Sequence, residues 1–182
     1  KSDMFILKQW RNSDIVRPYV REYRYLNDSD QESWYETYLV SRRKADFDQE
    51  LLIIQAEGGD LKDRNIVIDG RTFTGEAKIC NVPIGVGGFT RIEWRNRKAE
   101  FSFYIGEKQR FSRMIQPAIE ELLKIGFMEL GFHKISWPVY AHDSSLELYK
   151  SLFQVEAVLK EEYYWNGRLQ DRIYLSKINS GA

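Results

Sequence analysis

The sequence predicts an α/β fold, in which a central sheet is flanked by helices. Residues 99–105 alternate between apolar and polar side chains, which is the pattern of a half-buried strand. Residues 115–130 place apolar side chains at the spacing of one helix face. An Asp-Gly pair at 69–70 and an Asn-Gly pair at 166–167 predict two hairpins, because such pairs fit a type I′ turn. The length suits a single domain over residues 1–182, with a substantial core.

The N-terminal residues predict a strand followed by a helix. Residues 5–10 are mostly apolar and predict the first strand. Asp14 is a plausible N-cap for a helix over residues 15–23, because its carboxylate can accept a hydrogen bond from the first helical N–H groups.

A second helix and a buried strand are expected next. Ser29 and Glu32 have the spacing of a capping box, with Ser29 as the cap. The helix should end near the basic residues 42–44, which suit a helix C-terminus. The continuous apolar run at 51–56 predicts a buried strand.

Residues 57–82 form the most irregular stretch of the sequence. Within it, residues 65–68 and 71–74 flank the Asp-Gly pair and predict a hairpin. Two interpretations stay open. The hairpin either decorates the edge of the sheet, or forms a flap over an acceptor site or an oligomer contact.

The rest of the chain continues the alternation of strands and helices. Strands are predicted at 83–92 and 134–139, a turn at 94–97, a short helix capped by Ser144 or Ser145, and a hairpin of residues 160–165 and 168–176.

Composition and charge exclude several classes of protein. Lys plus Arg and Asp plus Glu both number 27, so no global field attracts nucleic acid or an anionic membrane. Cys80 is the single cysteine and cannot form an internal disulfide, which favours a reducing compartment such as the cytoplasm. His133 and His142 have no second His or Cys at metal spacing, so we expect no metal site. No apolar run approaches the ~20 residues that span a bilayer.

The turn between the strand at 99–105 and the helix at 115–130 suggests a phosphate site. Residues 107–110 are polar, and Pro117 falls in the first helical turn, where its missing N–H costs nothing. Free N–H groups and the positive end of the helix dipole favour an anion there.

These residues also carry a family resemblance. Ala99-Glu100, the run at 104–108 and Arg110 resemble the acetyl-CoA-binding segment of the GNAT N-acetyltransferases. In that family the turn has Arg or Gln, two residues, Gly, one residue, and Gly or Ala, and its amides hold the CoA pyrophosphate. Here Arg113 and Ile115 stand at the two small positions.

The resemblance covers nearly the whole chain and implies the GNAT fold. That fold has a mixed, mostly antiparallel sheet flanked by helices, and residues 57–82 would then be an inserted hairpin. The sequence is most similar to the bacterial small-substrate branch, of the sugar-nucleotide or ribosomal-protein type.

The resemblance implies an enzyme that uses acetyl-CoA as co-substrate and transfers acetyl directly to a small amine. The first candidate acceptor is a nucleotide-linked amino sugar, and the second is a protein N-terminus. A different interpretation is a catalytically degenerate GNAT fold that serves as a binding or assembly module. It is suggested by the altered turn and by Phe153-Gln154, where the family has Gly-Phe. We expect no membrane partner, and a homodimer stays open.

Two residues are candidates for the chemistry. The first is Tyr149. In the family a Tyr protonates the leaving thiolate and follows a Ser by four residues, and Ser145 and Tyr149 have this spacing, with His142 at the usual Asn position. The alternative for Tyr149 is an amphipathic packing tyrosine. Glu100 occupies the position of the general base in the histone-acetylating branch, and the alternative is an ordinary exposed carboxylate.

The resemblance also implies a set of CoA contacts. They are Phe103, Tyr104, Ile105, Lys108, Arg110, Phe111, Ser112, Arg113, Met114, His142 and Ser145. The three cations in this set would replace amide contacts to phosphate, since charge-assisted hydrogen bonds are strong. The alternative is a solvated charge cluster.

The acceptor is expected near a basic and aromatic run at residues 17–25. Arg17, Arg21 and Tyr23 are the candidates there, with Trp34 from the next helix. Such residues suit an anionic acceptor that carries a ring. Aromatic packing between the helices explains the tyrosines equally well.

Overall fold

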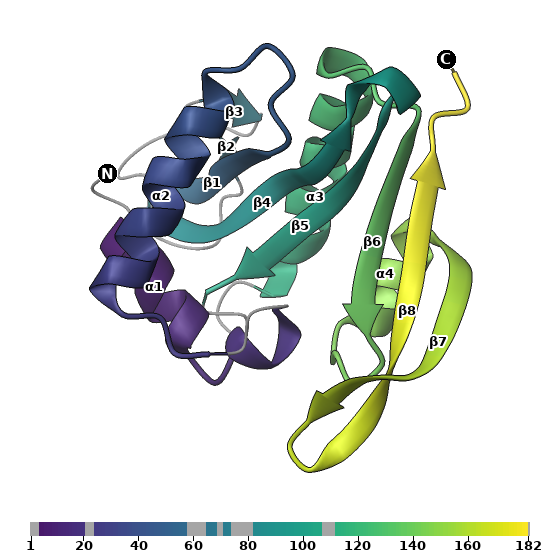
Figure 1. Cartoon of the computed structure of the whole chain (residues 1–182). Coiled ribbons are helices and arrows are strands. Elements are labelled where there is room, and N and C mark those ends of the chain that lie inside the picture. Colours follow the sequence, from purple (N-terminus) through teal and green to yellow (C-terminus); the bar gives the residue numbers. More distant parts are fainter. Residues whose placement is uncertain are drawn as a thin grey trace.

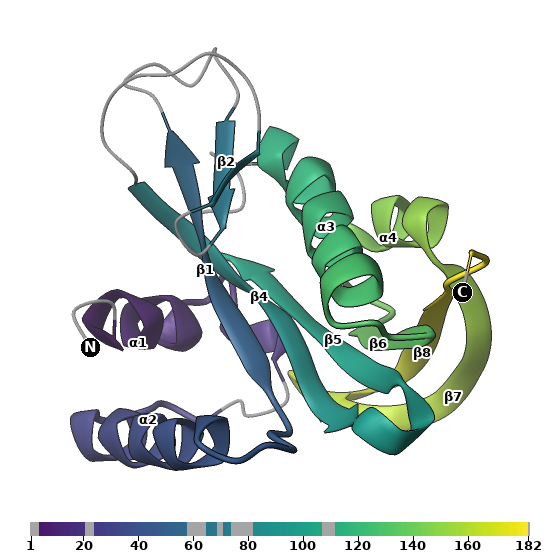
Figure 2. The ribbon, with the colours of Figure 1, turned by 90° about the horizontal axis from the view of Figure 1, so that it is seen from above.

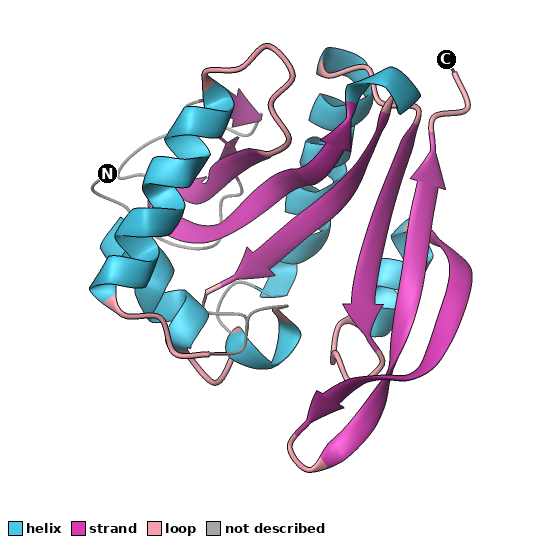
Figure 3. Ribbon diagram, viewed as in Figure 1, coloured by secondary structure: helices cyan, strands magenta, loops and turns pink. Residues whose placement is uncertain are grey.

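The computed structural model describes residues 4–20, 24–57, 65–68, 71–73, 82–106 and 112–181. In these residues one eight-stranded sheet has the order β3-β2-β1-β4-β5-β6-β8-β7 (Figure 1). The β5–β6 pair is parallel and the other described pairs are antiparallel. The prediction of a mixed, mostly antiparallel sheet flanked by helices is confirmed (Figure 3).

The strands are β1 (Glu50–Glu57), β2 (Asn65–Ile68), β3 (Arg71–Phe73), β4 (Val82–Glu93), β5 (Lys98–Ile105), β6 (Lys134–Tyr140), β7 (Gln154–Trp165) and β8 (Arg168–Ile178). The helices are α1 (Met4–Asn12), α2 (Asp28–Arg42), α3 (Ile115–Lys124) and α4 (Leu146–Leu152). Short helical turns are η1 (Arg17–Tyr19), η2 (Trp94–Asn96), η3 (Ser112–Met114) and the π-helical η4 (Ile125–Glu129).

The helices cover opposite faces of the sheet, with α1 and α2 on one face and α3 and α4 on the other (Figure 2). The apolar stripe of α3 forms the centre of the larger core, where Ile119 and Leu122 are fully buried beside Phe89 of β4. Burying one such side chain contributes roughly 1.5–3 kcal/mol. Gly87 of β4 lies directly under this helix, because a Cβ there would come within 2.3 Å of Leu122 Cδ1.

The prediction of a strand at residues 5–10 is wrong, because these residues lie in α1. Leu7 and Trp10 are the buried side chains of α1, and their spacing of three residues places both on one helix face. They form a smaller cluster with Val16 and Val86. This run of apolar residues is too short to separate a strand from a helix by periodicity.

The helix predicted at 15–23 is not formed in its described part, and Asp14 is not its cap. Residues 17–19 form the 3-10 turn η1, while 21–23 lie outside the described residues. Pro18 disfavours an α-helix here, since it lacks an N–H and its ring crowds the preceding turn. The Asp14 carboxylate pairs with Arg17 at 3.3 Å.

Helix α2 begins at a different cap from the one predicted. The Asn27 side chain accepts a hydrogen bond from the Asp30 N–H at 2.8 Å, and the Asp30 carboxylate accepts one from the Asn27 N–H at 3.0 Å. Ser29 therefore lies inside the helix. Asn caps a helix at least as well as Ser, and the spacing from Asn27 to Asp30 fits the same box. The predicted end near residues 42–44 is confirmed.

The other predicted strands and helices are present, although Ser145, at the N-cap position of α4, makes no side-chain capping hydrogen bond. The strand at 99–105 is β5, the stripe at 115–130 is α3 with η4, and the Asn-Gly hairpin is β7 and β8. The insertion contains β2 and β3, which pair antiparallel at the β1 edge of the sheet. The turn at 69–70, Cys80 and most other residues of the insertion lie outside the described residues.

In the part of the chain that the structure describes, no helix combines the length and apolar character needed to cross a membrane.

Candidate functional site

Strands β5 and β6 separate midway along their length. Their parallel ladder joins Lys98 to Lys134, Ala99 to Ile135 and Glu100 to Ser136. Both strands continue beyond that ladder, β5 to Ile105 and β6 to Tyr140, each paired on its outer side with β4 or β8. Their inner edges therefore border a V-shaped opening, visible in Figure 1. Backbone N–H and C=O groups on such edges can bind an extended ligand.

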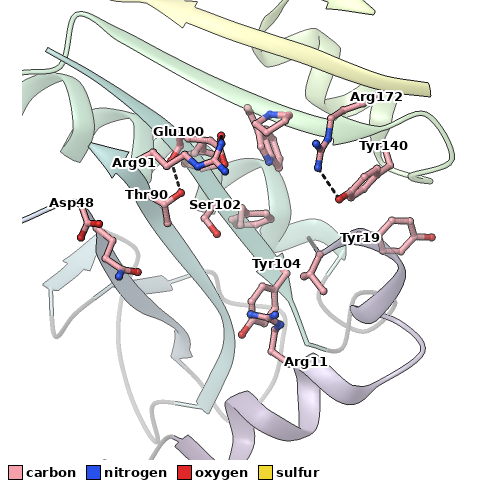
Figure 4. A pocket seen from close by; sticks show the side chains of 16 residues that line it. Arg11, Tyr19, Asp48, Thr90, Arg91, Glu100, Ser102, Tyr104, Tyr140 and Arg172 are labelled. Atoms are coloured by element: carbon pink, nitrogen blue, oxygen red, sulfur yellow. Dashed lines mark hydrogen bonds and ion pairs between the residues drawn. The ribbon is translucent and has the colours of Figure 1, made fainter. Parts of the chain in front are cut away.

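A cavity of about 380 Å³, here called the cleft cavity, lies at this opening (Figure 4). One wall is formed by Thr90, Arg91 and residues 100–104 of β4 and β5. The opposite wall is formed by Trp137, Pro138 and Tyr140 of β6 with Arg172 of β8. Arg11, Tyr19, Val20, Asp48 and Gln49 complete the lining.

A second cavity of about 520 Å³, here called the helix-side cavity, adjoins the first. It lies between α1, α2 and the sheet. The two cavities share Arg11, Gln49, Thr90, Ser102 and Tyr104. Together they extend from the opening between the strands to the α1 and α2 face.

Glu100 lies where the β5–β6 ladder ends. Its side chain is 16% exposed, and its carboxylate pairs with Arg91 at 3.3 Å. The Thr90 hydroxyl donates to the Glu100 backbone carbonyl at 3.5 Å. Because side chains alternate along a strand, Glu100, Ser102 and Tyr104 share one side of β5.

Tyr149 lies on the other face of the sheet, on α4. Its ring centroid is 4.3 Å from that of Trp137, and it lines a small cavity with Phe103, Ile105 and Ile115. Burial raises the pKa of the Tyr149 hydroxyl, and the negative charge of Asp143 adds to this. The hydroxyl also exchanges a hydrogen bond with the Ser145 side chain. It is therefore a proton donor at neutral pH and not a phenolate.

His142 packs between two tyrosine rings at the end of the opening. Its ring centroid is 5.3 Å from that of Tyr19 and 5.7 Å from that of Tyr140. Both ring nitrogens are buried, and neither has a hydrogen-bond partner among the described residues. The stack of three rings thus connects η1 to β6. Burial raises the pKa of the Tyr19 hydroxyl, and the negative charge of Asp143 adds to this.

Helix α3 begins at a third cavity, of about 350 Å³, which Ser112, Ile115, Ser144 and Ser145 line with Asp14, Ile15 and Tyr19. Met114 occupies the N-cap position and provides no side-chain hydrogen bond. The first N–H groups of α3 therefore have no side-chain cap. Together with the helix dipole, they can bind an anion.

No family model matches the sequence. Comparisons with single proteins and with solved structures do find similar proteins. A Bacillus licheniformis protein described as an uncharacterised N-acetyltransferase, p20, is 31% identical over 113 residues. This match covers 61% of the chain and 64% of that protein, which is less than two thirds of its length.

Solved structures match over nearly the whole chain. Spermidine N-acetyltransferase from Vibrio cholerae, in complex with CoA and spermine, has a TM-score of 0.73 at 21% identity. The match covers 99% of this chain and 92% of that one. A dodecameric structure of the Vibrio cholerae enzyme, in an intermediate state, has a TM-score of 0.66 at 20% identity, with 97% and 88% covered. The chain therefore has the fold of these N-acetyltransferases.

Several residues predicted from the GNAT resemblance lie around the opening. Glu100, Phe103 and Tyr104 line the cleft cavity, and Ser112 and Ser145 line the cavity at the start of α3. Ile105 is buried beside Tyr149, Met114 packs against the core, and the Arg113 side chain is exposed. Lys108, Arg110 and Phe111 lie outside the described residues.

The predicted acceptor residues are dispersed. Trp34 lines the helix-side cavity and stacks on Tyr38 with centroids 5.7 Å apart. Arg17 lines neither this cavity nor the cleft cavity, because its guanidinium lies over the rings of Tyr25, at 4.3 Å, and Trp165, at 5.8 Å. Arg21 and Tyr23 lie outside the described residues.

Sequence reasoning missed other residues that line the cleft cavity, above all Arg11, Arg91, Tyr140 and Arg172. For Arg172 the sequence carries only a weak indication, which is its place in the alternation of the strand at 168–178. Its side chain lies on the opposite side of that strand from the buried Ile173 and Leu175. Its partner Tyr140 is known only from the pairing of β6 with β8.

Proposed function

We propose that the protein is an acetyl-CoA-dependent N-acetyltransferase that acetylates a small amine. The observation that carries this proposal is the opening between β5 and β6, which has Glu100 on one side of the sheet and Tyr149 on the other. The N-acetyltransferase names of the similar proteins, and the CoA complex of one of them, support it.

Acetyl-CoA would enter from the α3 and α4 face. Its pyrophosphate would bind at the uncapped start of α3, near Ser112 and Ser145. Ile115 lines this cavity as well, and most of its side chain packs in the core. Binding of acetyl-CoA at this place would separate the proposal from the alternative of a degenerate GNAT module. The pantetheine arm would follow the inner edge of β5.

The reaction needs one proton acceptor and one proton donor. The amine nitrogen attacks the thioester carbonyl carbon, and the C–S bond then breaks with its electron pair on sulfur. The nitrogen loses a proton and the thiolate gains one. Glu100 is our candidate to accept the first proton, and the Tyr149 hydroxyl, kept protonated by its raised pKa, is our candidate to donate the second.

The acceptor would enter from the α1 and α2 face through the helix-side cavity. A nucleotide-linked amino sugar is the first candidate, because arginines line both cavities. A protein N-terminus is the second candidate. A polyamine is the third candidate acceptor, because the similar Vibrio cholerae structure contains spermine. The cytoplasmic location and the homodimer stay predictions.

Calorimetry with acetyl-CoA, followed by turnover of an amine panel, tests the proposal. The Tyr149→Phe variant should bind acetyl-CoA as the wild type does and lose about 100-fold in kcat, since general acids contribute at least that factor. Tyr164→Phe is the matched control, because Tyr164 is 66% exposed on β7. Absence of binding at millimolar acetyl-CoA would contradict the proposal. A kcat within threefold of the wild type would make Tyr149 a packing residue.

A further inference from the structure

We propose that Arg172 binds an anionic group of the acceptor, so that the acceptor is an amine that also carries a phosphate or a carboxylate. This inference rests on the proposed function, because it names the substrate class of the same cleft cavity. The geometry of one guanidinium and the charges around the cavity carry it.

Arg172 is held against the cavity wall by β6. It pairs with Tyr140 in the β6–β8 ladder, its Nη2 donates to the Tyr140 hydroxyl at 3.0 Å, and its guanidinium lies 5.2 Å from the centre of that ring. The side chain is only 16% exposed. These contacts fix the direction of the guanidinium without neutralising its charge.

The charge of Arg172 is poorly matched by the protein. Among the described residues, the carboxylate paired with it is that of Glu162, at 3.9 Å, which is too long for a hydrogen bond. Its Nε is buried without a hydrogen-bond partner in the described part of the chain. A guanidinium has five N–H donors, and a buried one is normally satisfied by a carboxylate or a phosphate. Arg172 lines the cleft cavity, so an anion bound there would give the guanidinium a carboxylate or phosphate partner.

The remaining charges of the cavity also favour an anion. Its described lining contains three guanidinium groups, of Arg11, Arg91 and Arg172, and two carboxylates, of Asp48 and Glu100. Glu100 pairs with Arg91, and the exposed Asp48 accepts a hydrogen bond from the Ser41 hydroxyl at 2.5 Å. This balance disfavours a polycation such as a polyamine, which needs acidic side chains around it.

The two walls therefore have different roles. Figure 4 shows Arg172 and Tyr140 on one side of the cavity, with Arg91 and Glu100 on the other. An amine held near Glu100 and an anion held near Arg172 would orient the acceptor across the opening. The fork of a guanidinium suits both a phosphate and a carboxylate, so the shared chemistry is that of an oxyanion.

A matched set of amines tests this. Ethanolamine, β-alanine and O-phosphoethanolamine place a primary amine beside a neutral, a carboxylate or a phosphate group, and spermidine adds the polycation. For the wild type, kcat/KM for at least one anionic amine should exceed that for ethanolamine about tenfold or more. The better of the two identifies the anion. In Arg172→Gln this ratio should fall about tenfold, whereas Arg168→Gln, at the exposed start of the same strand, should leave it unchanged.

A binding measurement separates failure of this inference from failure of the proposed function. Thermal stability is measured against inorganic phosphate and acetate for the wild type and both variants. Stabilisation that Arg172→Gln alone loses supports the anion site, even if no amine is acetylated. Acetylation without a preference for anionic amines, or an equal loss for every amine in Arg172→Gln, overturns the inference and leaves the enzyme assignment intact. Absence of both turnover and Arg172-dependent binding overturns both.

Discussion

The two faces of the sheet are packed differently. On the α3 and α4 face the sheet carries a large apolar cluster that includes the fully buried Phe89, Ile119 and Leu122. On the α1 and α2 face the buried cluster of the described residues is limited to Leu7, Trp10, Val16 and Val86. The α3 and α4 face carries Tyr149 and the start of α3, where we place acetyl-CoA. The cavities where we place the acceptor lie toward the α1 and α2 face. In this proposal acetyl-CoA binds at the firmly packed face, and the acceptor binds at the lightly packed one.

The largest expected effect is on stability, from truncation in the two clusters. Leu122→Ala should lower the free energy of unfolding by about 2–5 kcal/mol, because its cavity is enclosed by the large core. Leu7→Ala should cost about 1–2 kcal/mol, because the small cluster can adjust around a partly accessible site. Urea titration with unchanged m-values gives both numbers. Equal losses would show that the two faces are packed equally.

The second prediction concerns alkaline pH. Burial raises the pKa of Tyr104 to about 12, from 10.0, against a smaller opposing effect of Arg11. Between these values the unfolded chain has released this proton and the folded chain has kept it, so ionisation favours unfolding. The contribution of Tyr104 to the free energy of unfolding should be fully present below pH 10. It should fall as the pH rises toward 12, by up to about 1.4 kcal/mol per pH unit.

Tyr104→Phe should make the unfolding free energy less dependent on pH in that range. Some dependence should persist, since the pKa of Tyr149 is also raised, on the opposite face. Denaturant titrations at several alkaline pH values measure both slopes. Identical slopes for the two proteins would mean that Tyr104 ionises in the folded chain as it does in the unfolded one.

The sequence predicted the large-cluster face well. The α3 stripe and the alternation of β5 are long enough to define their periods, and the Asn-Gly pair fixes the last hairpin through its backbone conformation, with Asn166 at φ 49° and Gly167 at φ 78°. The small-cluster face was predicted poorly. Helix α1 buries only two side chains, so its apolar pattern fits a strand equally well, and Asn27 displaced Ser29 as the α2 cap.

The site divides in the same way. Glu100, Tyr104 and Tyr149 could be found because each belongs to a motif within one segment. Arg11, Arg91 and Arg172 come from three separate elements, and only the three-dimensional fold brings them to one cavity. Arg17 illustrates the converse. It belongs to a suggestive basic and aromatic run, but its guanidinium packs on the aromatic rings.

The smallest expected effect is that of Trp34→Ala, which tests the lightly packed face as the acceptor side. Trp34 is 37% exposed, so its loss should change the unfolding free energy by only about 0.5 kcal/mol. Because it lines the helix-side cavity, we expect KM for the amine to rise several-fold, with little change in KM for acetyl-CoA. Phe5→Ala is the control, since Phe5 is 64% exposed on α1 and does not line that cavity. If Trp34→Ala instead raises KM for acetyl-CoA, the two substrates approach from faces opposite to those proposed here.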